Sequence, residues 1–243
     1  MRLDKRAVGW LSRRSGRPEL LAAVDAGARQ AQREEIGIAA VLASSLPSDG
    51  TYVDVGANRG QVLREALRVA PRGRHVAFEP IPALAAEVAR AFPQVDCRQK
   101  ALGARRELAQ FCHFTLLDGW SGLRRHPGIS DTQGRPQYIE VEVSTLDDEL
   151  AGLTPSVLKI DVEGAELAVL EGGRALLEAT RPIVIFEHVP ETAGLYGDAP
   201  DAAWELFATL GYRIFSVTGE GPLTRSGFLG SSAVVNWLAV PER

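Results

Sequence analysis

Residues 54–60 read Asp54-Val55-Gly56-Ala57-Asn58-Arg59-Gly60, and they join a β-prone run at 51–55 to a helical pattern at 60–70. Gly56 and Gly60 allow the backbone to turn tightly and allow a ligand to come close to it. The helix that follows presents free backbone amides in its first turn. This stretch therefore predicts a strand-to-helix turn that binds a ligand at one edge of a sheet.

The chain around this turn alternates between β-prone and helical segments. Strands followed by helices are typical of parallel βαβ units, in which helices cover both faces of the sheet. Only a loop separates the last two β-prone segments, which predicts an antiparallel hairpin at one edge. We therefore expect an α/β fold with a doubly wound, Rossmann-like sheet of seven strands. The expected strands are 51–55, 75–79, 94–99, 156–161, 182–187, 212–217 and 233–240.

The residues near the turn indicate which ligand it binds. Glu79 ends the second expected strand, where a carboxylate can accept hydrogen bonds from both hydroxyls of a ribose. The glycine spacing is G-x-x-x-G, whereas a dinucleotide site has G-x-G-x-x-G. Asp54 would repel a pyrophosphate but not the cationic methionine end of S-adenosylmethionine. The pattern therefore favours S-adenosylmethionine over a nicotinamide dinucleotide.

Several further stretches carry a family resemblance. They are Phe78-Glu79-Pro80, Lys100-Ala101-Leu102-Gly103, residues 143–148 and 158–166, Leu210-Gly211-Tyr212 and residues 236–241. Together with 52–60, they resemble the FkbM family of class I S-adenosylmethionine-dependent methyltransferases. The Lys-Ile-Asp-Val-Glu-Gly run at 159–164 is the most selective of them. The resemblance implies an enzyme that transfers a methyl group to a hydroxyl of a sugar or a natural product.

The expected cofactor site follows the turn and the neighbouring strand ends. The turn surrounds the methionine end of the cofactor, and Glu79 holds its ribose. The resemblance places the adenine at Lys100 and Ala101, where Ala101 acts through its backbone. The cofactor-binding residues that we expect are Asp54, Gly56, Asn58, Gly60, Glu79, Lys100, Ala101 and Asp161.

Methyl transfer to an alcohol needs an aligned hydroxyl and a group that takes its proton. Asp161 and Glu163 follow one expected strand, and Glu187 and His188 follow the next. Ligands of open α/β sheets bind outside such strand ends. We expect His188 to be the base, flanked by Glu187 and Asp161 as further catalytic residues, because its unperturbed pKa is about 6.5. In an alternative, Asp161, Glu187 and His188 are ligands of Mg²⁺.

Residues 107–143 interrupt the alternation with two β-like runs and a Gly/Arg/Pro-rich loop. A long loop inside a compact domain is usually functional or mobile. We expect this inserted hairpin to lie near the acceptor site. An aromatic ring there can stack on the acceptor, and a guanidinium can bind an acidic or phosphorylated one. The substrate-binding residues that we expect are Trp120, Ser121, Arg124 and Glu163.

Charge and composition limit the function classes. The chain has 243 residues with 27 basic and 31 acidic side chains, and this net charge of −4 gives no support to nucleic-acid binding. Asp161-Val162-Glu163-Gly164 stands where nucleic-acid amino methyltransferases carry an Asp/Asn-Pro-Pro-aromatic run. Two cysteines are too few for a disulfide framework. No apolar run approaches the ~18 residues of a membrane span.

The basic charge is concentrated at the start of the chain. Residues 1–46 predict a basic helical extension, and 47–243 predict the methyltransferase domain. The extension can be an acceptor lid or a homodimer arm. It lacks the apolar core of a secretory signal, so we expect a cytoplasmic protein. The charged residues among the first 20 are Arg2, Lys5, Arg6, Arg13, Arg14, Arg17, Asp4 and Glu19.

Two other function classes stay open. The first is a nicotinamide-dependent oxidoreductase on the same sheet, which the glycine spacing and Asp54 disfavour. The second is a non-catalytic adapter, which the acids at several strand ends disfavour, although a fold alone never shows activity. The favoured partner is a glycoside or polyketide-like small molecule with a free hydroxyl, as in natural-product biosynthesis.

Overall fold

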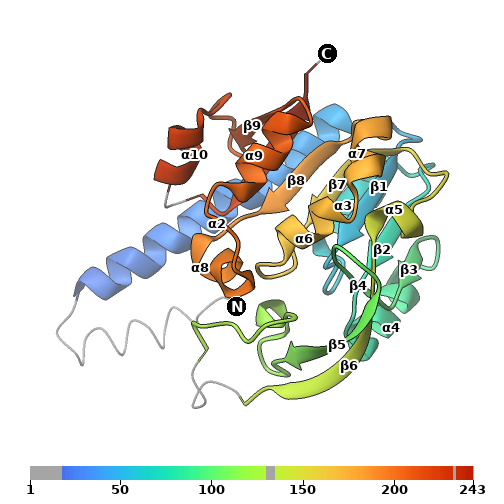
Figure 1. Cartoon of the computed structure of the whole chain (residues 1–243), viewed down its shortest axis with the longest axis horizontal. Coiled ribbons are helices and arrows are strands. Elements are labelled where there is room, and N and C mark those ends of the chain that lie inside the picture. The colour runs from blue at the N-terminus through green and yellow to red at the C-terminus, as the bar shows by residue number, and fades with distance from the viewer. Residues whose placement is uncertain (1–17, 130–134, 232–233, 243) are drawn as a thin grey trace.

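The computed structural model describes residues 18–129, 135–231 and 234–242 (Figure 1). Its main feature is a seven-stranded sheet in the order β3-β2-β1-β7-β8-β10-β9. β1, β2, β3, β7 and β8 are parallel, whereas β10 pairs antiparallel with β8 and β9. This confirms the expected α/β fold and its antiparallel edge. The strands are β1 Thr51–Val55, β2 Val76–Phe78, β3 Asp96–Arg98, β7 Pro155–Ile160, β8 Ile183–Glu187, β9 Tyr212–Ser216 and β10 Asn236–Pro241.

Helices cover both faces of the sheet. One face packs against α2 (Pro18–Ser45), α3 (Gln61–Val69) and α4 (Pro82–Ala91). The other face packs against α6 (Glu166–Glu171), α7 (Arg174–Thr180) and α9 (Ala202–Thr209). Side chains alternate along a strand, so neighbouring residues of β1 belong to different cores. Short helices complete the described chain: α5 Leu146–Glu149, η1 Asp118–Trp120, α8 Pro190–Ala193, η2 Gly194–Tyr196 and α10 Arg225–Gly230.

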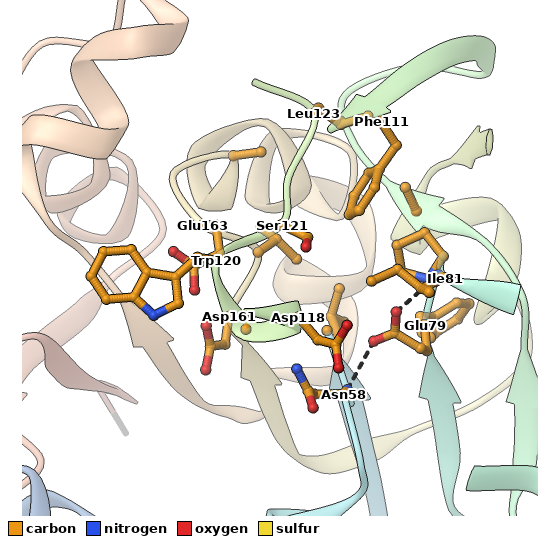
Figure 2. Close-up of a pocket in the computed structure, with 18 of the residues that line it drawn as sticks. Asn58, Glu79, Ile81, Phe111, Asp118, Trp120, Ser121, Leu123, Asp161 and Glu163 are labelled. Carbon is orange, nitrogen blue, oxygen red and sulfur yellow. Dashed lines mark hydrogen bonds between the residues drawn. The ribbon is translucent and has the colours of Figure 1, made fainter. Parts of the chain in front are cut away.

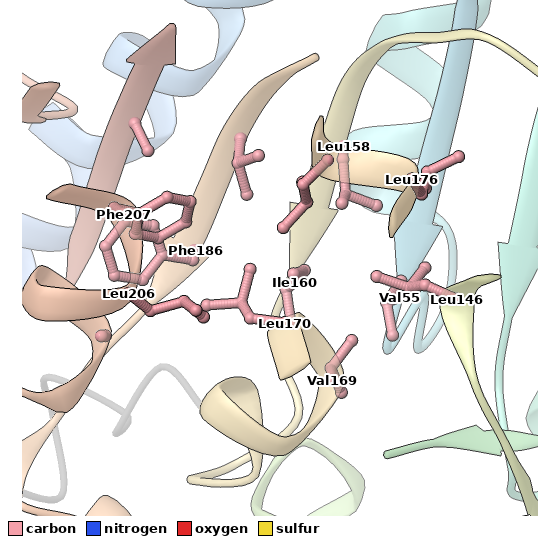
Figure 3. Packing of buried hydrophobic residues seen from close by; sticks show 14 of the residues in the cluster. Val55, Leu146, Leu158, Ile160, Val169, Leu170, Leu176, Phe186, Leu206 and Phe207 are labelled. Carbon is pink, nitrogen blue, oxygen red and sulfur yellow. The ribbon is translucent and has the colours of Figure 1, made fainter. Parts of the chain in front are cut away.

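The larger core lies on the face covered by α6, α7 and α9 (Figure 3). Val55, Leu158 and Ile160 extend from the central strands into it, and all are essentially inaccessible to water. Phe186 of β8 and Phe207 of α9 meet with ring centroids 4.9 Å apart. Burial of such side chains stabilises a fold by about 1.5–3 kcal/mol each. The core therefore holds the carboxyl ends of β1 and β7 in fixed positions.

A second, three-stranded sheet contains the inserted hairpin. It contains β4 (Ala101–Leu102), β5 (Glu107–His113) and β6 (Gln137–Ser144), in the order β4-β6-β5. β5 and β6 are antiparallel, and Cys112 forms a further bridge to Gly122 in the long connection between them. The connection folds back toward the carboxyl ends of β1 and β2 as a result. Residues 130–134 of this connection lie outside the described residues.

Helix α2 is anchored to the sheet by its second half. Ile38 and Leu42 are buried in the core that contains Tyr52 and Val217. In Figure 1, its first half extends past the body of the domain. The basic residues from Arg2 to Arg17 lie outside the described residues. Among the described residues, no helix has the length and apolar character needed to cross a membrane.

Candidate active site

The turn after β1 requires glycine at Gly56. This residue has φ 82°, and a Cβ atom there would overlap the carbonyl oxygen of Asp161. The backbone amides of Gly56 and Ala57 both donate to the carbonyl oxygen of Phe78, at 3.0 Å each. Gly60 has φ 70° and closes the turn ahead of α3. The sequence motif therefore brings the ends of β1, β2 and β7 together.

Glu79 is a buried and oriented carboxylate at the end of β2. Its Oε2 accepts the Asn58 amide at 2.8 Å and its Oε1 accepts the Ile81 amide at 2.9 Å (Figure 2). Burial raises its pKa to about 7, although these two amides favour the charged form. A carboxylate has about four lone-pair sites, so one stays open on each oxygen. This arrangement fits the two hydroxyls of a ribose.

A cavity of about 500 Å³ opens beside Glu79, and we call it the first cavity. Its walls are the glycine turn, the ends of β2 and β7, and the connection between β5 and β6. Its size lies in the range of about 300–1,000 Å³ that is usual for ligand sites. The expected residues that line it are Gly56, Asn58, Glu79, Lys100, Ala101, Trp120, Ser121, Asp161 and Glu163.

A second cavity, of about 720 Å³, lies between α2 and the glycine turn. Asp54 lines this cavity and not the first one. Gly60 lines neither, because it packs near the ring of Phe92. The two cavities adjoin each other, since Gly56 and Asp161 line both. The expected methionine-binding residues are therefore divided between two adjoining spaces.

Lys159 is buried and forms an ion pair with the partly exposed Asp161, with 2.8 Å between Nζ and Oδ2. Burial lowers the pKa of Lys159, but the charges of Asp161 and Asp54 outweigh it and keep the lysine protonated. Desolvation raises the pKa of Asp161, but Lys159 lowers it further and keeps the carboxylate ionised. No role was expected for Lys159 from the sequence. The sequence did offer a signal for this pair. Lys159 lies in a strand expected to be buried, and it precedes an acid by two residues, so both side chains lie on the same face.

Three carboxyl groups meet beyond the end of β7. Oxygens of Asp161, Glu163 and Glu187 lie within 4.8 Å of one another. Desolvation and the charge of Asp161 raise the pKa of Glu163 to about 9, and they raise that of Glu187 well above its usual value. Like charges at this distance cannot all ionise. We call this group the carboxyl trio, and its ionised member is Asp161.

His188 does not join the trio, which corrects the expected base and the expected Mg²⁺ ligand set. Its Nε2 donates to the carbonyl oxygen of Pro200 at 2.9 Å, and its ring stacks on Phe228 with centroids 5.1 Å apart. Desolvation lowers its pKa. The reason is strand alternation: Glu187 points toward the trio, so His188 points away from it. Glu163 takes the place that was expected for His188.

The first cavity is lined by three of the four residues expected to bind the acceptor, namely Trp120, Ser121 and Glu163. Trp120 lines the first cavity, and its ring lies edge-on to His126 with centroids 4.4 Å apart. The Ser121 hydroxyl accepts the Phe114 amide at 3.0 Å, so it holds the connection in place. Arg124 is exposed and lines neither cavity. The inserted hairpin therefore contributes mainly to the cavity that contains Glu79.

The side chain of Lys100 forms ion pairs that lie away from the carboxyl ends of the main sheet's strands. Its Nζ lies 2.7 Å from Glu142 of β6 and 3.0 Å from Glu149 of α5. These two contacts fix β4 beside β6. The side chain therefore stabilises the wall of the first cavity, which Ala101 also lines.

Arg59 connects the turn to the hairpin and was also missed from the sequence. Its guanidinium contacts Glu87 and Asp118, at 2.6 Å each. The other oxygen of Asp118 lies 3.1 Å from Nε2 of His113. An arginine between the two glycines of the motif was the available signal. These contacts hold η1 against the mouth of the first cavity.

Three curated proteins are similar in sequence to part of this chain. The chain is 29% identical over 161 residues to Methyltransferase sdnD of Sordaria araneosa, covering 53% of this chain and 62% of that protein. It is 30% identical over 149 residues to Methyltransferase 1 of Beauveria bassiana (strain ARSEF 2860), covering 52% and 59%. It is also 29% identical over 207 residues to the AMB antimetabolite synthetase AmbE of Pseudomonas aeruginosa, covering 70% and 10%. The chain thus spans less than two thirds of each relative.

A solved structure has the same fold. It is the FkbM methyltransferase of Methylobacillus flagellatus KT, which is 14% identical, with a TM-score of 0.50, covering 91% of this chain and 60% of that one. The family model of the methyltransferase FkbM domain matches residues 54–214, which is more than half of the chain. The expected family is therefore confirmed, and the chain belongs to the FkbM methyltransferase family.

Proposed function

We propose that this protein is an S-adenosylmethionine-dependent O-methyltransferase that acts on a hydroxyl of a sugar or natural-product small molecule. Asp161 is the observation that carries the proposal. Its carboxylate is kept ionised by Lys159, and it lines both cavities at their junction. An acceptor hydroxyl at this junction meets a proton acceptor and the cofactor site together.

The first cavity fits the nucleoside part of the cofactor. Glu79 offers one open lone pair on each oxygen to the ribose hydroxyls. The backbone near Ala101 faces the adenine, and Gly56 allows the cofactor to come close to the turn. When bound, S-adenosylmethionine supplies a methyl group on a positively charged sulfur. The surrounding carboxylates favour that charge.

The residues of the junction align and deprotonate the acceptor. Asp161 accepts a hydrogen bond from the acceptor hydroxyl and so directs an oxygen lone pair toward the methyl group. Asp161 would take the hydroxyl proton as the acceptor is methylated. Glu163 and Glu187 are protonated neighbours that can hydrogen-bond to Asp161 and adjust its basicity.

Isotope-labelled methyl transfer tests this proposal. Purified protein is incubated with methyl-labelled S-adenosylmethionine and a panel of hydroxylated glycosides and polyketides, and products are detected by mass spectrometry. We expect a methyl ether in the product and a loss of turnover of about 10²–10⁴-fold in Asp161→Asn. Binding of S-adenosylhomocysteine should change only a few-fold.

Glu140→Gln is the matched control, because Glu140 is an exposed carboxylate outside both cavities. It should leave turnover unchanged. The label on nitrogen or carbon, or full turnover in Asp161→Asn, would contradict the proposed chemistry.

A further inference from the structure

The second cavity has polar groups at both its floor and its rim. The floor contains Asp54, Lys159 and Asp161 beneath the glycine turn. Helix α2 forms the opposite wall, from Ala26 to Ile38. The space is therefore enclosed by the sheet edge on one side and by the N-terminal helix on the other.

Asp54 is a buried carboxylate with an unused oxygen. The residue is only 2% exposed, and its Oδ1 has no hydrogen-bond partner at ordinary distance among the described residues, although the neighbouring Tyr52 hydroxyl helps to lower its pKa. An unpaired buried polar group destabilises a fold, and an unpaired charged group does so more strongly. A ligand that fills this cavity is therefore expected to place a hydrogen-bond donor, and best a cation, on Asp54.

The rim of the cavity is formed by the middle of α2, and it carries two arginines. Arg29 and Arg33 both line the space, and they lie one helical turn apart on adjacent surface. Both are exposed, and neither pairs with a carboxylate among the described residues. Two acidic residues of α2, Glu34 and Glu35, line the cavity beside them, and neither forms an ion pair with these arginines.

The nearby Glu34 does not compensate for these arginines. Its carboxylate accepts the backbone amides of Val235 and Asn236 at 3.2 Å each and the Asn236 side-chain amide at 2.8 Å. This contact fixes α2 against the start of β10. Glu34 therefore holds the rim in place, and the two arginines of the rim remain able to bind an anion.

We propose that the amino-acid end of the cofactor extends into the second cavity, with its ammonium on Asp54 and its carboxylate on Arg29 and Arg33 of helix α2. A buried acid below and two arginines above match a zwitterion, whose two charged groups share one carbon. Arginine stems are long enough to fold over a ligand and bind a carboxylate with two parallel hydrogen bonds. The cavities join at Gly56 and Asp161, so one ligand can occupy both.

This inference rests on the proposed cofactor and assigns α2 to its site. Three probes separate the parts of the ligand in calorimetric titrations. S-adenosylhomocysteine carries the whole amino-acid end, decarboxylated S-adenosylmethionine lacks only the carboxylate, and 5′-methylthioadenosine lacks both charged groups. The wild-type protein should bind S-adenosylhomocysteine at least tenfold more tightly than 5′-methylthioadenosine.

The variant Arg29→Ala/Arg33→Ala should weaken S-adenosylhomocysteine by about tenfold or more, the loss expected for one charge-assisted contact. It should leave decarboxylated S-adenosylmethionine and 5′-methylthioadenosine unchanged. Because both arginines are exposed, the variant should keep its unfolding temperature. Arg90→Ala, an exposed arginine on α4 outside both cavities, is the matched control.

Two outcomes would overturn the inference. If S-adenosylhomocysteine and 5′-methylthioadenosine lose affinity equally, α2 only stabilises the structure of the site. If the affinity of every probe is unchanged, the arginines do not contact the ligand. Both leave the proposed function intact. A wild-type protein that binds neither adenosine compound would contradict the proposed cofactor itself.

Discussion

The two cavities differ in how their polar groups are satisfied. In the first, the oxygens of Glu79 already accept backbone amides, and Arg59 is paired with Glu87 and Asp118. In the second, Asp54 has an unused oxygen and the arginines of α2 have no acidic partner among the described residues. The first cavity is thus suited to neutral hydroxyls, and the second is suited to charged groups. One ligand with a neutral and a zwitterionic end would satisfy both.

The largest effect is expected from a substitution in the glycine turn, which lines both cavities. In Gly56→Ala, the new Cβ would overlap the carbonyl oxygen of Asp161, so the turn must move. We expect S-adenosylhomocysteine binding to fall by more than about 100-fold, which is about 2.7 kcal/mol, and the unfolding temperature to fall as well. Calorimetry and thermal unfolding measure the two quantities.

Gly152→Ala is a matched control for that substitution. Gly152 also has a left-handed backbone, with φ 77°, but no atom lies within 4 Å of the place that a Cβ would take. This substitution should lower the stability of the fold by only roughly 1–2 kcal/mol, because alanine is strained in a left-handed backbone. The ligand affinity should stay unchanged. If both alanine variants bind equally well, the close approach at Gly56 has no role in the site.

Glu79→Gln should affect the first cavity alone. The glutamine amide nitrogen cannot accept the backbone amide that its carboxylate oxygen accepts now, and one ribose hydroxyl loses a charged partner. We expect affinity for S-adenosylhomocysteine and 5′-methylthioadenosine to fall together, by about 10–100-fold. A loss confined to one of the two compounds would contradict the ribose assignment.

A smaller effect is expected from pH. Burial raises the pKa of Asp54 to about 6, although Lys159 lowers it, and Asp161 and Tyr52 also border the group. As pH rises from about 5 to about 7.5, Asp54 loses its proton and can bind an ammonium. The affinity ratio of S-adenosylhomocysteine to 5′-methylthioadenosine should therefore rise several-fold, because the ratio cancels the titration of Glu79. An affinity ratio that does not change with pH in this range would show that Asp54 does not bind the ammonium.

The smallest effect on activity is expected at His188. Its ring hydrogen-bonds to Pro200 and stacks on Phe228, outside both cavities. His188→Gln should keep turnover and cofactor affinity, and it should lower stability by about 1–2 kcal/mol. A loss of turnover above tenfold at unchanged stability would restore His188 as the base.

The first cavity was largely predictable from the sequence, and the second was not. The glycine turn, Glu79 and Asp161 follow β1, β2 and β7, which are neighbours in the sheet, and parallel strands end at one sheet edge. His188 failed because one residue beyond Glu187 changes the side of the strand. The second cavity depends on which face of α2 meets Asp54, and the contact of Glu34 with Asn236 joins residues 202 positions apart. No local pattern encodes that pairing.

A crystal structure of the complex with S-adenosylhomocysteine tests the central claim most directly. We expect the ribose hydroxyls within hydrogen-bond distance of both oxygens of Glu79, the sulfur near Asp161, and the α-amino group on Oδ1 of Asp54. A nucleoside bound away from Glu79, or an amino-acid end directed away from Asp54, would contradict a cofactor that occupies both cavities.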